Sequence, residues 1–521
     1  MTSQVPDAVS AQTNGTENPI NRSPSPPPKK MRGLTAVMIV SATGLVAMVV
    51  GLAVGLLWTT IFHNILIQQL TLTPTSKSYS LWKETPLPMY LKLHLFNWTN
   101  PEDFYVSSKI KPHFVEMGPY VFKEVDSKEN QVWNDNNNTV TFQQKRVWHF
   151  VESMSNGSLS DQVTNLNPVA TTIAYMMRYK IDMIKMLINS GMRAAHENLT
   201  VTKTVEELLF NGYDDRMLKW ATKLNKSLVP FDKFGWFYQR NNSAPYDGTF
   251  NMLTGHGNIH DLGVLKEWNY SNKSKFHSST CGEISGSLGD LWGPVKDAET
   301  LQFFAPDVCT SMNLVFNNLT EHSGITGREY ISNREMLDNG TLVESRKCYC
   351  DGIECIPSGA FNVSKCKFGA PAFISLPHFY LADESYRSAI DGMEPHEEKH
   401  RFSITIEPKT GIPMQVRGKL QLNLLIQPDK FIEIFKNVPR TFVPMLWFSQ
   451  EADLTSSLAS QVKFVLILPL LGQVTLYGIA AIGFLLLAIG TGIYIRRTRR
   501  GDDGQSLIPK VESNGGERTI G

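Results

Sequence analysis

The chain has 521 residues, and its 50 basic and 49 acidic side chains give a formal net charge of +1 at pH 7. This balance argues against a nucleic-acid-binding protein, which would carry a basic stripe for phosphate contacts. Hydrophobic residues make up 42% of the chain, an ordinary share for a protein with a packed core. The composition therefore predicts a globular body to which any membrane-spanning segment is attached.

Residues 1–32 are polar and end in Ser-Pro repeats followed by basic residues, so we expect a disordered cytoplasmic tail. Residues 33–62 then contain no Asp, Glu, Lys, Arg or His. About 20 apolar residues cross a bilayer as a helix, and a buried helix of a soluble protein seldom stays uncharged for this length. The 32-residue leader argues against a cleaved signal peptide. This segment is predicted to be transmembrane helix 1.

Small residues recur at every fourth position of this segment, at Thr43, Ala47, Gly51 and Gly55. Such a stripe lets another helix approach closely. Two partners remain open, the second membrane segment or a neighbouring molecule in a homo-oligomer. Gly is common in membrane helices in any case, so the stripe alone does not establish that the helix has a partner.

Residues 464–495 form a second uncharged run, predicted to be transmembrane helix 2, and residues 496–521 form a second tail. Basic residues lie next to each predicted helix on the side of the nearer chain terminus: Lys29, Lys30, Arg32, Arg496, Arg497, Arg499 and Arg500. Positive charge stays in the cytoplasm, so both termini are predicted to be cytoplasmic. Residues 63–463 then form one extracellular or lumenal receptor domain of a two-pass protein.

Cysteines and glycosylation sequons indicate the same compartment for this domain. All six cysteines lie within residues 281–366, and an even, clustered set outside the cytosol predicts three disulfides. Spacing alone allows 15 ways of pairing six cysteines. Eleven N-x-S/T sequons lie in the same domain, at Asn97, Asn137, Asn156, Asn198, Asn225, Asn241, Asn269, Asn272, Asn318, Asn339 and Asn362.

Most of the domain has the alternation typical of strands. Residues 89–98, 118–125 and 139–151 alternate apolar and polar side chains, with Asn and Asp clusters between them. Residues 402–408 and 419–427, separated by a turn at 409–411, predict a hairpin. In its second strand, Leu residues point to one side and Lys419, Gln421 and Asn423 to the other. The body is therefore predicted to be mainly antiparallel β-structure.

Helical spacing replaces this alternation from residue 168 to about 224, with interruptions expected at Gly191 and Gly212. The first part combines methionines with basic residues, which suits a surface that binds varied amphipathic or acidic ligands. The alternative, slightly favoured by the pattern, is an ordinary helix that packs its Met side into the core. If the segment binds ligand, the candidate residues are Met183, Lys185, Met186, Arg193 and His196.

Residues 396–400 match H-E-x-x-H, the pattern of zinc proteases, with His396, Glu397 and His400. Zinc proteases need a long helix that presents both histidines on one face. Here Pro395 precedes the first histidine, and a predicted strand begins at Phe402. The whole sequence also contains no G-x-S-x-G, P-loop or Rossmann fingerprint. We therefore expect no enzyme activity, no cofactor and no metal.

The C-terminal tail holds a sorting pattern. Asp503 is followed after three residues by Leu507 and Ile508, an acidic dileucine pattern of the kind that clathrin adaptors read. A disordered cytosolic tail is the context that this motif requires. The tail predicts cycling from the plasma membrane to endosomes or lysosomes.

Several longer motifs together resemble the class B scavenger receptor family. They are GPY at 118–120, LQFFAPDVC at 301–309, AFISLPHF at 372–379 and IDGMEPHEEKHRFSITIEPKTGIPMQ at 390–415. The likeness covers both membrane segments and the whole domain between them. The predicted fold class is thus α+β, with two transmembrane helices flanking a large ectodomain.

The resemblance implies an irregular antiparallel β-barrel core, an apical helical bundle over residues 168–235 and an apolar lipid tunnel. It also implies the disulfides Cys281–Cys348, Cys309–Cys366 and Cys350–Cys355. A lysine that some members use for fatty-acid contact is replaced here by Ala194, with Arg193 and His196 beside it.

The function implied is a receptor that binds lipid, lipoprotein or polyanionic cargo for lipid transfer or endocytic uptake. Fatty acids, sterols, carotenoids and lipoproteins are the expected ligands, and the chain would make or break no bond. Two alternatives stand beside it: an endolysosomal sorting receptor for a protein ligand, and an epithelial adhesion glycoprotein.

Overall fold

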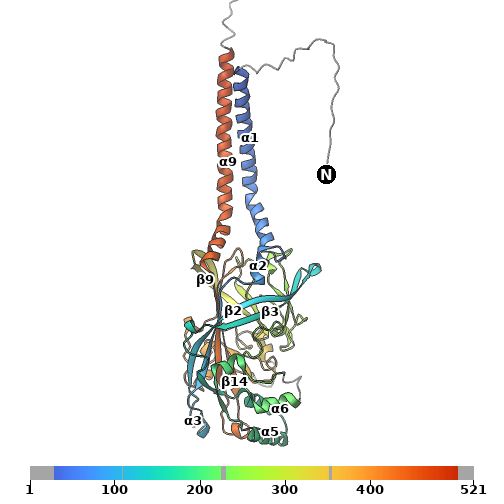
Figure 1. Cartoon of the computed structure of the whole chain (residues 1–521), viewed down its shortest axis with the longest axis vertical. Coiled ribbons are helices and arrows are strands. Elements are labelled where there is room, and N and C mark those ends of the chain that lie inside the picture. Colours follow the sequence, from blue (N-terminus) through green and yellow to red (C-terminus); the bar gives the residue numbers. More distant parts are fainter. Residues whose placement is uncertain (1–28, 108, 225–229, 351–354, 503–521) are drawn as a thin grey trace, which may run out of the picture. The chain divides into compact units, whose positions relative to one another are not determined.

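The computed structural model describes residues 29–107, 109–224, 230–350 and 355–502. The chain divides into two compact units, the body His63–Leu466 and a helical unit made from the segments on either side of it. Both predicted disordered tails lie mostly outside the described residues, and so do Asn225 and the dileucine residues Asp503, Leu507 and Ile508. Figure 1 shows the course of the chain.

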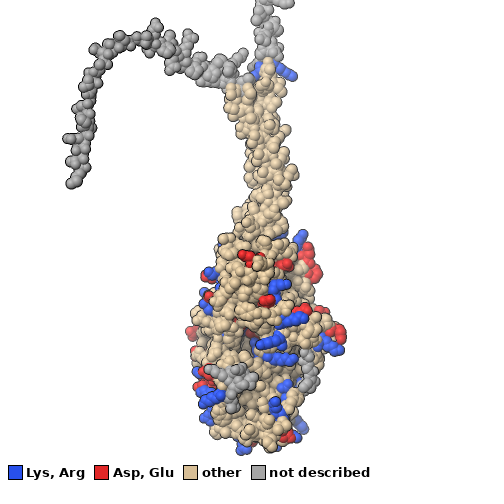
Figure 2. All heavy atoms as spheres, turned by 90° about the vertical axis from the view of Figure 1, so that its right-hand side faces the viewer, with Lys and Arg blue, Asp and Glu red and all other residues tan. Residues whose placement is uncertain are grey.

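The helical unit is built from α1 (Lys29–Leu70) and α9 (Ser456–Asp502). In the described part of the chain, these two helices are long and apolar enough to cross a membrane, from Thr35 to Leu70 and from Ser456 to Arg499. Figure 2 shows the helical unit without charged side chains except at one end, where α9 carries Arg496, Arg497 and Arg499.

The small-residue stripe of α1 lies against α9. A Cβ atom on Gly51 would approach the carbonyl oxygen of Leu476 to 2.7 Å, and one on Gly55 would meet the ring of Tyr477 at 2.8 Å. Both distances are too short for a side chain. The glycines therefore permit close contact between the two helices, and the second membrane segment is the partner of the stripe.

The body is organised by a 13-stranded antiparallel sheet. Its main order is β7-β6-β3-β2-β1-β15-β14-β13-β10-β9-β8, and β12 pairs with both β14 and β11. The strands are β1 (Met89–Trp98), β2 (Phe114–Asn134), β3 (Thr139–Phe150), β6 (Thr249–Leu253), β7 (Leu265–Trp268), β8 (Thr300–Ala305), β9 (Thr310–His322), β10 (Ile325–Ile331), β11 (Ala360–Asn362), β12 (Ala372–Ser375), β13 (Ser403–Ile406), β14 (Pro413–Ile426) and β15 (Thr441–Asp453).

This sheet curls into a nearly closed barrel. Its two edge strands, β7 and β8, are bridged by a short segment that forms hydrogen bonds to both. The N–H of Leu265 donates to the carbonyl of Gly286 at 2.9 Å, and the N–H of Phe304 donates to the carbonyl of Ser287 at 2.8 Å. The prediction of an antiparallel barrel-like core is confirmed, and closing the edges removes unpaired strands from solvent.

Leu and polar side chains alternate along β14 as predicted, and both faces are buried from Gly418 to Ile426 except at Leu422. Gln421 and Asn423 have no exposed surface. The amide of Asn423 donates to the carbonyl of Phe373 at 3.2 Å and to Ser375 Oγ at 3.0 Å. These partners belong to β12, which pairs with β14 in the same sheet. The polar side chains are tolerated inside because they form hydrogen bonds.

Helices gather mainly in the region from residue 168 to 224, where α4 (Pro168–Met177), α5 (Asp182–Ala195) and α6 (Arg216–Leu224) lie beside a hairpin of β4 (Gln162–Leu166) and β5 (Thr200–Thr204). Shorter helices elsewhere are α2 (Lys77–Lys83), α3 (Pro101–Val106), α7 (Glu384–Ser388) and α8 (Glu397–His400). A π-helical turn, η3 (Glu207–Asn211), precedes α6, and the 3₁₀ turn η7 (Pro377–Phe379) follows β12.

The helical region breaks at a different place from the one predicted. Gly191 lies inside α5, while the interruption falls at residues 178–181 between α4 and α5. There the N–H of Lys180 returns to the carbonyl of Met177 at 2.8 Å, and the chain reverses. A glycine costs a helix only about 1 kcal/mol, which the surrounding packing offsets. Gly212 does end its helical turn, with φ at +67°.

Candidate functional site

Helix α4 is anchored firmly in the body. Asn167 accepts hydrogen bonds from the N–H groups of Val169 at 3.1 Å and Ala170 at 3.0 Å, and Pro168 occupies the first helical turn. This is a strong N-terminal cap. The helix buries Val169, Ala170 and Ala174, so its position is fixed by the core.

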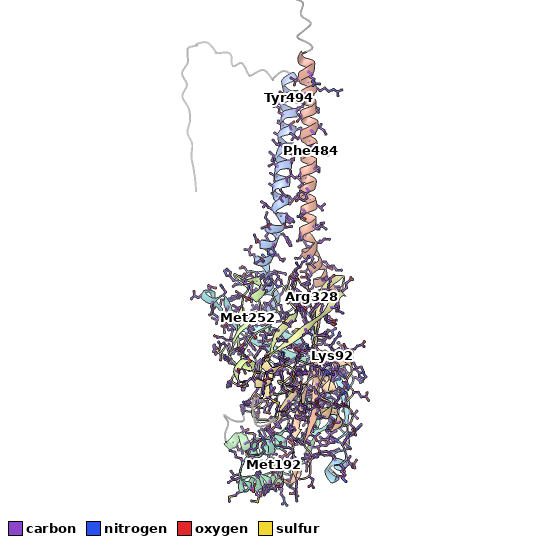
Figure 3. All side chains as sticks on the ribbon, turned by 180° about the vertical axis from the view of Figure 1, so that it is seen from behind. Lys92, Met192, Met252, Arg328, Phe484 and Tyr494 are labelled. Atoms are coloured by element: carbon purple, nitrogen blue, oxygen red, sulfur yellow. A yellow bond between two sulfur atoms is a disulfide. The ribbon has the colours of Figure 1, made fainter. Side chains whose placement is uncertain are left out.

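Helix α5 has an exposed apolar face, which we call the apical face. Its largest members are Ile181, Met183 and Leu187, with exposures of 66%, 72% and 71%. Ile184 and Met186 are exposed as well. On the opposite side Met192, labelled in Figure 3, and Ala195 are buried. The expectation that the methionines pack into the core is therefore wrong for Met183 and Met186, and right for Met192.

The basic candidates on α5 have different environments. Lys185 Nζ lies 2.9 Å from Asp429 Oδ2, and both side chains are nearly buried. Arg193 lies 3.6 Å from Glu433, and both of these side chains are mostly exposed. His196 ends the helix in the left-handed conformation, with φ at +59°. Lys185 is therefore held in a structural ion pair, whereas Arg193 and His196 belong to the surface.

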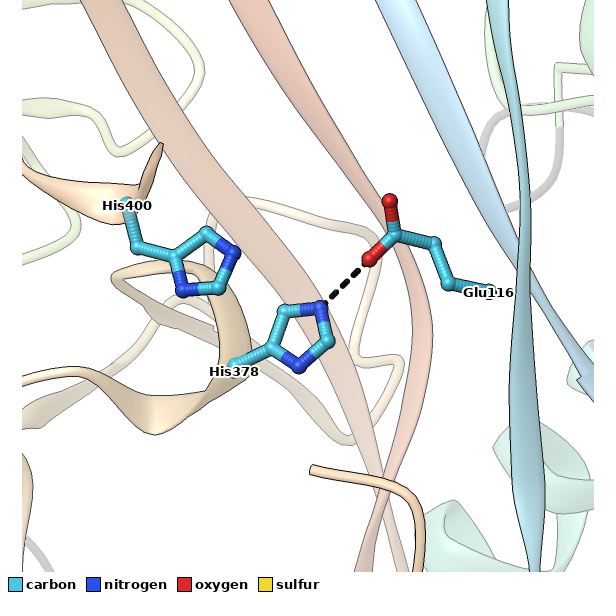
Figure 4. A group of neighbouring side chains, drawn as sticks. All are labelled: Glu116, His378 and His400. Atoms are coloured by element: carbon cyan, nitrogen blue, oxygen red, sulfur yellow. Dashed lines mark hydrogen bonds and ion pairs between the residues drawn. The ribbon is translucent and has the colours of Figure 1, made fainter. Parts of the chain in front are cut away.

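A second cluster, which sequence analysis did not find, joins Glu116, His378 and His400 (Figure 4). Glu116 on β2 accepts hydrogen bonds from His378 Nε2 at 2.6 Å and from His94 Nδ1 at 2.7 Å. The ring of His378 stacks on that of His400, with centroids 4.3 Å apart. Because Glu116 and His378 are 262 residues apart, no local pattern links them.

The hydrogen bonds of this cluster do not suit a divalent metal. Nδ1 of His378 accepts from the N–H of Glu394, and Nδ1 of His400 accepts from the N–H of His396, both at 3.0 Å. A neutral imidazole has one proton, so each ring carries it on Nε2. The Nε2 lone pair that would bind a metal beside Glu116 is therefore occupied by a proton.

The H-E-x-x-H segment also differs from a zinc-protease helix. Helix α8 is a single turn from Glu397 to His400, and His396 precedes it in an extended conformation. The two rings lie 6.0 Å apart at a 45° angle. His400 packs instead against His378 and the ring of Trp447. Through the contact between His400 and Trp447 of β15, the motif attaches α8 to the barrel.

Burial of Glu116 alone would raise its pKa, but the hydrogen bonds from His378 and His94 outweigh burial and hold the pKa well below its usual range. The pKa of His400 is lowered as well, to about 3. Burial is the main cause, because it disfavours the charged form of a base, and His378 makes a smaller contribution. The cluster thus consists of an ionised carboxylate among histidines, of which His400 stays neutral in mild acid.

Three disulfides bind the segment from residue 281 to 366: Cys281–Cys348, Cys309–Cys366 and Cys350–Cys355. These are the pairs that the family resemblance implies. Each long-range bridge fixes a loop to the barrel, because Cys309 follows β8 and Cys281 precedes it. Removing such a bridge from an extracellular domain typically costs about 2–5 kcal/mol.

The described sequons differ in exposure. Nine are partly or fully exposed, at Asn97, Asn137, Asn156, Asn198, Asn241, Asn269, Asn272, Asn318 and Asn362. Asn339 is only 3% exposed. Its amide nitrogen, where a glycan would attach, donates to the carbonyl of Ile356, and its oxygen accepts from Thr341 Oγ1 at 2.8 Å.

The CD36 family model matches residues 42–494, nearly the whole described chain. The chain therefore belongs to the CD36 family, which contains class B scavenger receptors, and is a two-pass membrane protein of the scavenger-receptor class. Protein peste of Drosophila melanogaster is 37% identical over 419 residues, 80% of this chain and 75% of that protein.

Two mammalian relatives are covered almost completely. Scavenger receptor class B member 1 of Cricetulus griseus is 32% identical over 86% of this chain and 87% of its own length. Lysosome membrane protein 2 of Rattus norvegicus is 31% identical over 90% of this chain and 95% of its own length.

The lowered pKa of His400 predicts that mild acid destabilises the body. An unfolded histidine takes up its proton near pH 6.5, whereas the folded one does so only near pH 3. Stability contributed by the neutral ring is thus present above pH 6.5 and lost as the pH falls toward 3. Between pH 7 and pH 5 we expect a loss of up to about 2 kcal/mol.

The measurement is unfolding of the full-length protein at pH 7 and pH 5, followed by tryptophan fluorescence. His400→Gln should remove most of the difference between the two pH values. His149→Gln, at an exposed histidine, is the control and should keep it. An unchanged pH dependence in His400→Gln would show that other groups are responsible.

Burial of Asn339 predicts that this sequon carries no glycan in the mature protein, since a sugar has no room beside Ile356. Thr341→Ala, which destroys this sequon, should leave the glycoprotein mass unchanged. Thr320→Ala, which destroys the exposed Asn318 sequon, should lower the mass by one glycan where Asn318 is occupied. Glycopeptide mass spectrometry provides the direct count, and substantial occupancy at Asn339 would contradict the packing around it.

Proposed function

We propose that this protein binds lipid, lipoprotein or polyanionic cargo through its helical region, for lipid transfer or endocytic uptake. The observation that carries the proposal is the apical face of α5, where Ile181, Met183 and Leu187 are each about two-thirds exposed or more. A soluble domain rarely exposes adjacent large apolar side chains without a partner. Covering them with the surface of a lipid particle removes apolar area from water and contributes about 25 cal/mol of binding free energy per Å² buried.

The composition of the apical face supports cargo of varied structure. Methionine is unbranched and flexible, so Met183 and Met186 can adapt to different apolar surfaces. Arg193 and His196 lie on the same helix and mostly in solvent, where they can meet the acidic groups of a particle surface. Surfaces of this kind bind many different ligands and discriminate weakly among them.

Transfer of lipid requires a path from the helical region into the body. The lipid tunnel that the family resemblance implies is part of this proposal. Fatty acids, sterols and carotenoids are the ligands that an apolar path would accept, because their burial needs no specific polar chemistry.

The proposal also sets the orientation in the membrane. The described end of α9 carries Arg496, Arg497 and Arg499, and the basic residues at 29–32 occupy the corresponding end of α1. The positive-inside rule supports two cytoplasmic tails and an extracellular or lumenal body. The protein would then reside at the plasma membrane and cycle to endosomes.

Replacing Met183 and Leu187 with Ser should weaken binding of lipid-coated particles at least about tenfold, since two buried apolar contacts of roughly 1.5–3 kcal/mol each are lost. Both side chains are exposed, so folding should be unaffected. The measurement is binding of phosphatidylcholine-coated lipid particles to the full-length protein in nanodiscs. Leu342→Ser, at another exposed leucine, is the control. Equal affinity of all three proteins would remove the apical face as the binding surface.

A second candidate function is sorting of a protein ligand to lysosomes. It is favoured by the similarity to lysosome membrane protein 2 over 90% of this chain. The acidic dileucine residues Asp503, Leu507 and Ile508, which clathrin adaptors would read, support the same route.

Replacing Leu507 and Ile508 with Ala should raise the amount of protein at the cell surface, because an adaptor can no longer bind the tail. Surface biotinylation and lysosomal fractionation provide the measurement. Exchange of Glu512 for Gln, in the same tail but outside the motif, is the control. Unchanged surface and lysosomal levels would exclude adaptor recognition through this motif.

A further inference from the structure

A basic groove lies between the α4–α5 turn and the loop that follows β14. It has a volume of about 460 Å³, within the usual range of small-molecule sites. Its lining includes four basic side chains and one acidic side chain, namely Arg178, Lys185, Lys430, Arg440 and Asp429. The groove is separate from the apical face, whose exposed side chains do not line it.

The single acidic residue of the groove is neutralised within the protein. Asp429 Oδ2 lies 2.9 Å from Lys185 Nζ, and its Oδ1 accepts a hydrogen bond from the N–H of Phe431 at 2.9 Å. Both carboxylate oxygens are therefore engaged, and the side chain is 8% exposed. Arg178 and Lys430 then contribute positive electrostatic potential to the groove.

Arg178 is held in place before any ligand arrives. Its guanidinium lies 3.6 Å from the ring centre of Tyr175 and 4.5 Å from that of Tyr179. One of its N–H groups donates to the carbonyl of Tyr175 at 2.6 Å. A guanidinium has five N–H donors in a planar fork, which suits two oxygens of one anion. Stacking between two rings lowers the entropy that binding would otherwise cost.

Five of the eight residues that line the groove are charged, and its apolar members are Pro428 and the ring of Tyr179. The adjoining cavity, which shares Arg178, Gln427 and Asp429 with it, has a volume of only about 10 Å³, enough for about one water molecule. Gln427 and the hydroxyl of Tyr179 add groups that pair with hydroxyls. A tetrahedral anion alone would leave much of the groove empty, whereas a polar ring would fill it.

We propose that this groove binds a sugar ring that carries a sulfate or phosphate ester. The ester oxyanion is recognised by Arg178 and Lys430, and the hydroxyls of the ring by Gln427 and Tyr179. The inference names one chemical class within the polyanionic cargo of the proposed function and rests on that function to this extent. It assigns the class to a surface other than the apical face.

The test uses the full-length glycoprotein in phosphatidylcholine nanodiscs and isothermal titration calorimetry. The probes are a heparin-derived sulfated disaccharide, glucose 6-phosphate, the unsulfated disaccharide and dioctanoyl phosphatidic acid. We expect at least one sugar ester to bind, with affinity that falls as salt rises, and the unsulfated sugar not to bind. Comparison of the sulfated disaccharide with the sugar phosphate distinguishes the two sources of the anion.

Arg178→Gln and Lys430→Gln should each weaken sugar-ester binding about tenfold or more, which corresponds to roughly 1.4 kcal/mol. Lys180→Gln is the matched control, because Lys180 is an exposed basic residue two positions from Arg178 that does not line the groove. Lys430 is exposed, so its variant tests the site even if loss of Arg178 disturbs the α4–α5 turn.

Equal binding of the sulfated and unsulfated sugars, or equal loss in the Lys180 variant, would overturn the proposal. So would binding of phosphatidic acid through Arg178 and Lys430 without binding of either sugar ester, because the site would then recognise a lipid headgroup. Lipid-particle binding measured on the same samples separates the two proposals. If lipid particles bind but no sugar ester binds, the proposal for the groove fails and that for the apical face stands. If a sugar ester binds but lipid particles do not, the proposal for the apical face fails and that for the groove stands.

Discussion

The pairing of the first and last long strands of the body is the constraint on which the rest of the structure depends. β1 pairs with β15 in an antiparallel register that begins with Met89 opposite Ala452. β15 ends three residues before α9, and β1 begins 19 residues after α1. The points where the chain enters and leaves the body are therefore held together by main-chain hydrogen bonds. In the strand order of the sheet, β1 and β15 are neighbours with further strands on both sides, so this pairing joins the part of the sheet from β7 to β1 to the part from β15 to β8.

Closure of the sheet between its edge strands β7 and β8 is supported by a buried cluster of charged side chains. Lys128 on β2 is fully buried and lies 2.6 Å from Asp126 and 2.8 Å from Asp290. Asp290 follows directly after the segment at Gly286 and Ser287 that bridges β7 and β8. Replacing Lys128 with a neutral residue would leave two largely buried carboxylates without their cation, and breaking a buried ion pair in this way typically costs about 3–5 kcal/mol. The same strand carries Glu116, so β2 holds loops from distant parts of the chain through ionised groups.

Features that depend on local sequence could be predicted, and those that depend on distant contacts could not. The membrane helices, the hairpin of β13 and β14, and the helical region all follow from runs and periods of side chains. The burial of Gln421 and Asn423 does not, because the hydrogen-bond partners of Asn423 lie on β12, which comes from another part of the chain. Lys185 likewise looked like a surface cation until the fold placed Asp429, 244 positions away, beside it. The residues next to Glu116 and His378 in the sequence do not indicate that these two side chains lie together in a cluster.

The two proposed ligand surfaces of the helical region would recognise ligands by different physical interactions. Burial of Ile181, Met183 and Leu187 is governed by area, so the apical face gains free energy from almost any apolar surface and discriminates weakly. Arg178 and Lys430 gain free energy only from an anion in the correct position, so the groove discriminates strongly and its affinity depends on salt. The buried ion pair of Lys185 with Asp429 joins the two surfaces, because Lys185 is part of α5 and Asp429 is part of the groove.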